Sequence, residues 1–93
     1  MITAKPTITN TTLTSAATEY SYTFPAGTYK FEIRLRSGSS LLQIAFVSGA
    51  SGTTYITIPY GASYAETDAK VGGSVIYFQS PDAAQVAEIK IWK

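Results

Sequence analysis

The sequence predicts an all-β protein, a small antiparallel β-sandwich of about seven or eight strands. Apolar and polar residues alternate with a period of two in several short runs, which is the pattern of strands with one buried face. Turn residues such as Gly, Pro, Ser and Asp separate these runs, and no run has a helical period. Thr, Ser, Tyr, Val and Ile are abundant, as is typical of strands. A jelly roll is one such sandwich, but the alternation leaves the strand order open.

The clearest pattern predicts a β-hairpin over residues 19–36, with its turn at residues 25–28, Pro-Ala-Gly-Thr. Pro25 fixes φ in the turn, and Gly27 can adopt a positive φ. If Phe24 pairs with Tyr29, the apolar faces of the two arms coincide and the polar residues share the other face. The predicted apolar pairs are Phe24 with Tyr29, Tyr22 with Phe31, and Tyr20 with Ile33. The predicted polar pairs are Thr23 with Lys30, Ser21 with Glu32, and Glu19 with Arg34.

The remaining strands are expected at residues 7–14, 41–47, 53–58, 74–79 and 85–93. The first of them is a short outer strand whose main apolar residue is Ile8. Residues 59–63 are expected to form a turn and residues 64–70 a solvated loop, in which Glu66 and Asp68 are too few to bind calcium. The predicted core comprises Phe31, Ile33, Phe46, Ile56, Phe78 and Ile89.

Length and charge indicate one domain, residues 1–93, with residues 1–6 as a loose N-terminal arm because Pro6 cannot donate to a β-ladder. The net charge of +1 gives no strong field that would attract nucleic acid or an anionic membrane. The N-terminus has no apolar signal core, and no apolar run approaches the roughly 20 residues that span a bilayer. We therefore expect no nucleic acid or membrane partner and no export signal.

The residue types argue against catalysis. The sequence contains no His and no Cys, which removes the commonest general base and the commonest zinc ligands. No two acidic residues have a spacing recognisable as a glycosidase pair. Gly49 and Gly52 have the spacing of a phosphate loop, but neither a Lys nor a helical pattern follows them. We expect a protein that is not an enzyme, with no catalytic, cofactor-binding or metal-binding residues.

Outward-facing apolar residues are the candidate contact residues. Leu41, Ala45, Val47 and Tyr55 are expected to form an apolar patch, with Trp92 as a second exposed anchor. Aromatic side chains can also stack on sugar rings, but several of these have apolar neighbours, which favours protein contact. The patch predicts a homo-oligomer or a larger partner, unless another strand of the same chain covers it. The candidate protein-contact residues are Leu41, Val47, Tyr55, Tyr60 and Trp92.

Several runs resemble segments of small bacteriophage virion proteins. The runs are YTFPAGTYKFEIR (22–34), LQIAFVSG (42–49), YITIPYGASY (55–64), YFQSPDA (77–83) and EIKIW (88–92). The resemblance implies a β-sandwich that docks on a capsid lattice as a decoration or auxiliary head protein, commonly as a trimer. It implies the major capsid protein or another virion protein as partner, and a place in the virion after synthesis in the host cytoplasm. The alternative is a carbohydrate-binding module or a part of a phage tail or adhesion apparatus.

Overall fold

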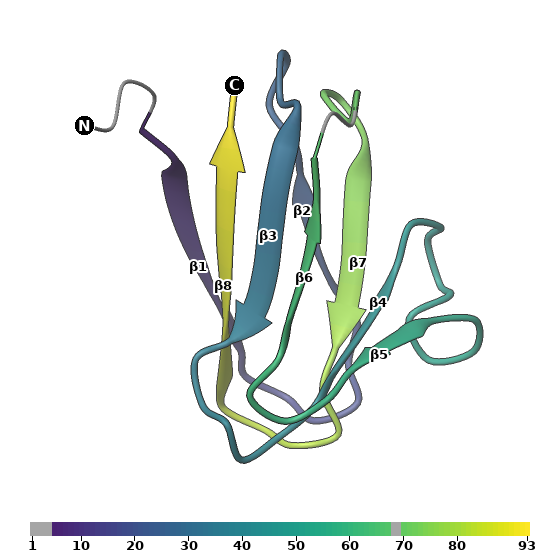
Figure 1. The fold of residues 1–93 in the computed structure, drawn as a ribbon. Coiled ribbons are helices and arrows are strands. Elements are labelled where there is room, and N and C mark those ends of the chain that lie inside the picture. Colours follow the sequence, from purple (N-terminus) through teal and green to yellow (C-terminus); the bar gives the residue numbers. More distant parts are fainter. Residues whose placement is uncertain (1–4, 68–69) are drawn as a thin grey trace.

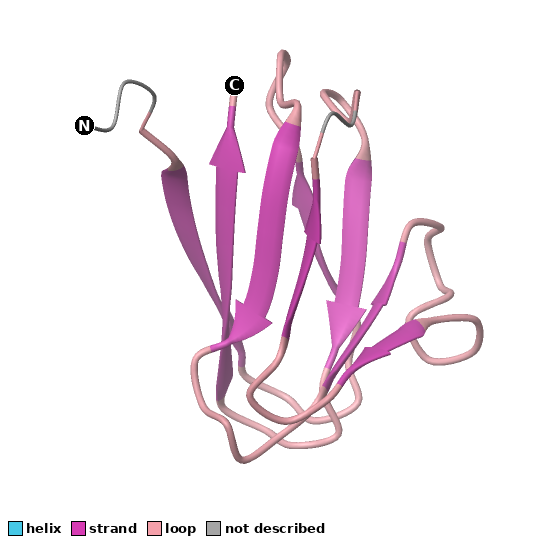
Figure 2. Ribbon diagram, viewed as in Figure 1, coloured by secondary structure: helices cyan, strands magenta, loops and turns pink. Residues whose placement is uncertain are grey.

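The structure, a computed structural model, describes residues 5–67 and 70–93. The chain forms two four-stranded antiparallel sheets packed face to face, and the described residues contain no helix (Figures 1 and 2). This arrangement confirms the predicted all-β sandwich. The strands are β1 (Thr7–Leu13), β2 (Tyr20–Thr23), β3 (Lys30–Leu35), β4 (Leu42–Ala45), β5 (Ile56–Ile58), β6 (Ser63–Glu66), β7 (Val75–Gln79) and β8 (Gln85–Trp92).

The strand order is that of a jelly roll. One sheet, called sheet A here, has the order β1-β8-β3-β6, and the other, sheet B, has the order β2-β7-β4-β5. Only β4 and β5 are both consecutive and paired, so every other connection carries the chain from one sheet to the other. The earliest strand therefore pairs with the latest one, as in other double-sheet jelly rolls.

The predicted hairpin over residues 19–36 is wrong. β2 pairs with β7 in sheet B, whereas β3 pairs with β8 and β6 in sheet A, so the predicted cross-strand pairs do not form. Phe24 and Phe31 still face one core, but their rings meet across it, with centroids 4.7 Å apart. The alternation specifies which face of each arm is buried and leaves its partner strand open, so a hairpin and a crossing between sheets both satisfy it.

The other predicted strands are present, and one strand was missed. Those expected at residues 7–14, 41–47, 53–58, 74–79 and 85–93 appear as β1, β4, β5, β7 and β8, with β4 and β5 shorter than expected. The missed strand, β6, lies in the segment predicted as a turn and a loop, because Tyr64 is its only large side chain that packs on the core. Asp68 lies outside the described residues, as do residues 1–4 of the predicted arm.

The hydrophobic core lies between the sheets and includes the predicted residues Phe31, Ile33, Phe78 and Ile89. Two predicted core residues are exposed instead, Phe46 by 46% and Ile56 by 47%. Ile56 is the register partner of the buried Ile44, so it continues the inward face of sheet B. It is nevertheless exposed, as the first residue of β5, which is the edge strand of sheet B.

A close backbone contact joins the β2–β3 connection to the β6–β7 connection at one end of the sandwich. The Gly73 N–H donates to the Phe24 carbonyl over 2.8 Å. A Cβ built on Gly72 would lie 2.8 Å from the Gly27 nitrogen and 3.1 Å from the Pro25 carbonyl oxygen. Gly72 is thus a position where only glycine fits without movement of the backbone. Gly27 has the expected positive φ, 87°.

Candidate functional site

The two outer faces of the sandwich differ in charge. On sheet A, which we call the charged face, β3 and β8 carry cations and carboxylates at their outward positions: Lys30, Glu32, Arg34, Glu88 and Lys90. On sheet B, which we call the uncharged face, the outward strand positions hold no ionisable group except the Tyr77 phenol. They are Ser21, Thr23, Gln43, Ala45, Thr57, Val75, Tyr77 and Gln79.

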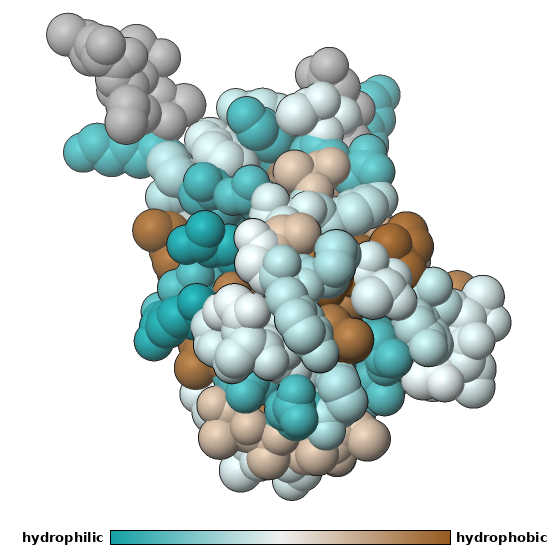
Figure 3. Space-filling view, turned by 60° about the horizontal axis from the view of Figure 1, so that its bottom comes forward, coloured by the Kyte–Doolittle hydropathy of each residue, from teal (hydrophilic) through white to brown (hydrophobic). Residues whose placement is uncertain are grey.

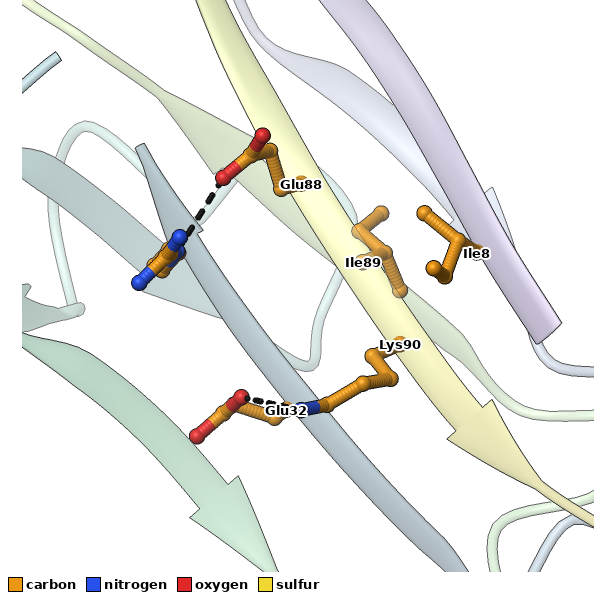
Figure 4. Close-up of a pocket in the computed structure, with 6 residues that line it drawn as sticks. Ile8, Glu32, Glu88, Ile89 and Lys90 are labelled. Carbon is orange, nitrogen blue, oxygen red and sulfur yellow. Dashed lines mark hydrogen bonds and ion pairs between the residues drawn. The ribbon is translucent and has the colours of Figure 1, made fainter. Parts of the chain in front are cut away.

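On the charged face the opposite charges bind each other. Arg34 and Arg36 donate from their Nε atoms to the two oxygens of the Glu88 carboxylate, over 3.0 and 2.9 Å. Lys90 Nζ lies 3.2 Å from Glu32 Oε1 (Figure 4). The hydrogen bonds from Arg36 and Arg34 lower the pKa of Glu88. The two arginines thus favour the ionised form of Glu88. Each of the two carboxylates already has a cationic partner within the chain, which suits a structural role.

Trp92 is half-buried, and cations lie over it. The Lys30 Nζ is 4.4 Å from the ring centroid, and the Lys90 Nζ is 5.2 Å from it. Both distances fall within the range of cation–π attraction. Trp92 was predicted to be an exposed anchor, but lysines from β3 and β8 lie against its ring, so a partner would have to displace them.

A shallow hollow of about 270 Å³ lies on the charged face. Figure 4 shows Glu32, Glu88, Lys90, Ile89 and Ile8 around it, and Arg34 completes the lining. The charged groups in the lining already form ion pairs with one another or with Arg36. The hollow therefore offers a ligand no charged group that is not already paired.

The long β4–β5 connection is anchored by Glu19. One carboxylate oxygen of Glu19 accepts a hydrogen bond from the Gly49 N–H over 2.9 Å, and the other accepts from the N–H and the hydroxyl of Ser51. The hydrogen bonds from Ser51 and Gly49 lower the pKa of Glu19. The Gly-rich loop at residues 48–52 thus does bind an anionic group, but that group is the chain's own carboxylate.

Four large apolar or aromatic side chains are exposed at the two ends of the β4–β5 connection and give the β4–β5 surface its name. We define it as Phe46, Val47, Tyr55 and Ile56, which flank the end of β4 and the start of β5. Val47 is the most exposed of them, at 68%. Phe46 also approaches Tyr64 of sheet A, with ring centroids 6.4 Å apart. Phe46 therefore lies near both sheets, at the end of β4.

The structure exposes some of the predicted contact residues and not others. Val47 and Tyr55 belong to the β4–β5 surface, whereas Tyr60 is exposed beyond the other end of β5. Leu41 is half-buried, and Ala45 is buried. Phe46 and Ile56 were not predicted as surface residues, because the alternation places them on the inward side of their strands, which is typical of core residues. Figure 3 shows apolar (brown) groups at other, separate places on the surface as well.

The described residues offer no sign of a metal site or a membrane span. Within residues 5–67 and 70–93, no group of three or more His, Cys, Asp or Glu side chains is placed to hold a metal ion. In the same part of the chain, no helix has the length and apolar character needed to cross a membrane.

The comparisons with known proteins leave the family open. No family model matches the chain, and neither the curated proteins nor the solved structures include a significant match to it. Function must therefore be argued from the surfaces described above.

Proposed function

We propose that this chain is a non-enzymatic structural protein of a bacteriophage particle, a capsid decoration or auxiliary head protein. It binds the surface of the major capsid protein or of another virion protein. The observation that carries the proposal is the β4–β5 surface, because Phe46, Val47 and Ile56 each expose apolar area that a partner protein would remove from water.

Three further points support this function. The runs that resemble small phage virion proteins include β4 and β5, the strands that flank the β4–β5 surface. Jelly rolls are common in viral capsid proteins, although this point is an analogy at the level of the fold. The carboxylates Glu19, Glu32 and Glu88 are all occupied by hydrogen bonds or ion pairs within the chain, which favours a structural role over catalysis.

The place of action follows from the same proposal. The protein is made in the host cytoplasm and joins the virion by docking on the assembled lattice. The resemblance favours a trimer on that lattice. Tyr60, which is 65% exposed at the far end of β5, is a second contact candidate.

The decisive experiment uses the phage whose genome encodes this sequence. Mass spectrometry of purified particles should detect the protein, and particles stripped of it should bind it again in a saturable way. Val47→Asp and Ile56→Asp should each weaken this binding by about tenfold or more, because a charge is desolvated at the contact. Thr53→Asp is the matched control, since Thr53 is exposed in the same connection and is polar.

The outcomes separate the proposal from its alternative. Absence of the protein from purified particles, or unchanged binding of both Asp variants, contradicts capsid docking. Sugar binding is the second candidate because the uncharged face presents hydroxyl and amide groups around Tyr77. Lectins also use the jelly-roll fold. A glycan array on which binding depends on Tyr77, with no binding to particles, would favour the sugar-binding function.

A further inference from the structure

The outer edge of β1 is the longest unpaired strand edge of the sandwich. In the described residues no strand pairs with β1 on the side away from β8, and its seven residues all have partners in β8. The other three edge strands are shorter: β2 and β6 have four residues each, and β5 has three. β1 therefore presents the longest row of backbone N–H and C=O groups with no partner strand.

This edge lacks the features that usually prevent strand pairing. Natural edge strands are protected by charged residues, above all Lys, by Pro, by bulges or by short length. β1 has the sequence TITNTTL, with no charge and no Pro, and its register with β8 is continuous without a bulge. In contrast, β6 ends on the charged Glu66, and β5 has only three residues. A proline adjoins β1 as well, but Pro6 precedes the strand and leaves its seven residues free of proline. The β1 edge is thus suited to receive another strand.

We propose that β1 pairs antiparallel with β1 of a second copy of this chain, about a two-fold axis at Asn10. The two sheets A then form one continuous eight-stranded sheet across the dimer. Asn10 is the middle residue of Thr7–Leu13, so the two strands overlap along their whole length only in this register. A two-fold axis makes the contact self-complementary, as in most homodimers.

The side chains of β1 fit this register. Asn10 lies opposite Asn10 of the second copy, Thr9 lies opposite its Thr11, and Ile8 lies opposite its Thr12. Thr–Thr and amide pairs across a strand pair are favourable, and no like charges meet. Ile8, which is 66% exposed in the monomer, gains a neighbour in the second copy. The net charge of +1 opposes the association only weakly.

A second copy fits the edge better than another strand of the same protein does. Pairing of β1 with β6 of a neighbour would match seven residues with four and would add the carboxylate of Glu66 to an uncharged edge. Such a head-to-tail contact would also build rings or filaments. The proposal is independent of what the β4–β5 surface binds, and it predicts a dimer contact in place of the trimer that the resemblance implies.

The first test uses Asn10→Lys, which places two ammonium groups opposite each other at the axis. In the monomer the new lysine would lie beside Glu88, the register partner of Asn10, so the fold should keep its melting temperature. The matched control is Ala65→Lys, on the other edge of sheet A, where Ala65 is exposed and opposite Glu32. Sedimentation velocity over roughly a hundredfold range of concentration should show a reversible dimer for the wild type and for Ala65→Lys, and a monomer for Asn10→Lys.

The second test fixes the register with cysteines, which the native chain lacks. Residues directly opposite on antiparallel strands have Cβ atoms about 4.5–5.5 Å apart, close to the separation that a disulfide bridges. Asn10→Cys should therefore oxidise to a covalent dimer. Ile8→Cys should cross-link to Thr12→Cys when the two proteins are mixed, and far less to itself.

Each alternative result overturns the proposal. A wild type that stays monomeric over the whole range, or an Asn10→Lys variant that dimerises like Ala65→Lys, shows that β1 is not the contact. A trimer or a larger ring shows a head-to-tail contact. Equal self-cross-linking of Asn10→Cys and Ile8→Cys shows that the register is not centred on Asn10.

Discussion

The contact between Phe24 and Phe31 gives the sharpest test of the topology. Both side chains are 1% exposed, and their rings meet across the core at 4.7 Å between centroids. Phe31→Ala should cost about 3–5 kcal/mol, a large part of the roughly 5–14 kcal/mol expected for a chain of this length. The gentler changes Phe24→Leu and Phe31→Leu should cost about 1–2 kcal/mol each and leave the double variant folded.

A double-mutant cycle then measures the contact itself. Urea unfolding of the two single variants and the double variant should give a coupling energy of about 0.5–1.5 kcal/mol, the usual worth of an aromatic pair. The control cycle combines Phe24→Leu with Tyr29→Leu and should give almost no coupling, because Tyr29 is exposed and belongs to the connection before β3. A hairpin would reverse this result, since it places Phe24 beside Tyr29. Coupling only in the control cycle would refute the two-sheet arrangement.

Three other perturbations test separate contacts. Gly72→Ala should cost about 1–3 kcal/mol in urea unfolding because its Cβ meets the backbone of residues 25–27, while Gly38→Ala, with no contact closer than 3.8 Å, should cost little. Glu19→Gln should speed amide hydrogen exchange at Gly49, because a neutral amide is a weaker acceptor than a carboxylate; unchanged exchange would contradict the anchoring of the loop. The pKa of Glu88 is lowered in the folded state, so its ion pairs stabilise the fold at pH values above the unfolded-state pKa. This stabilisation is lost as the pH falls through the folded-state pKa. The melting temperature of the wild type should therefore fall more steeply in acid than that of Glu88→Gln, and parallel curves would show that the two arginines do not stabilise the fold.

The sequence predicted which faces are buried better than it predicted which strands pair. The alternation in residues 20–24 and 29–35 correctly placed Phe31 and Ile33 in the core, because side-chain parity is a local property of a strand. Strand pairing is not local, because the residues of β3 pair with residues of β8 that lie more than fifty positions later in the chain. A turn such as Pro-Ala-Gly-Thr can reverse the chain within one sheet or carry it to the other, so the hairpin could not be distinguished from a crossing.

The same limit affected the candidate surfaces. Val47 and Tyr55 were placed correctly on the surface because they occupy outward positions. Phe46 and Ile56 occupy positions that the alternation assigns to the core, but Phe46 follows the last residue of β4 and Ile56 begins the edge strand β5. A local pattern shows neither where a strand ends nor whether it lies at the edge of a sheet. The lysines over Trp92 were likewise unforeseen, because Lys30 and Trp92 become neighbours only when β3 pairs with β8.

The pairing of β1 with β8 also constrains how the protein can fold during synthesis. β8 lies between β1 and β3 in sheet A, so these two strands lack their shared neighbour until residues 85–92 have left the ribosome. Before that point, β3 and β6 are the only strands of sheet A that can pair with each other. β1, with its uncharged edge, therefore has no partner strand during most of translation. Pairing between strands that are distant in the sequence is also slow. Nascent chains on neighbouring ribosomes therefore expose the same unpaired strand to one another, and the arrival of β8 ends this exposure on one side of β1.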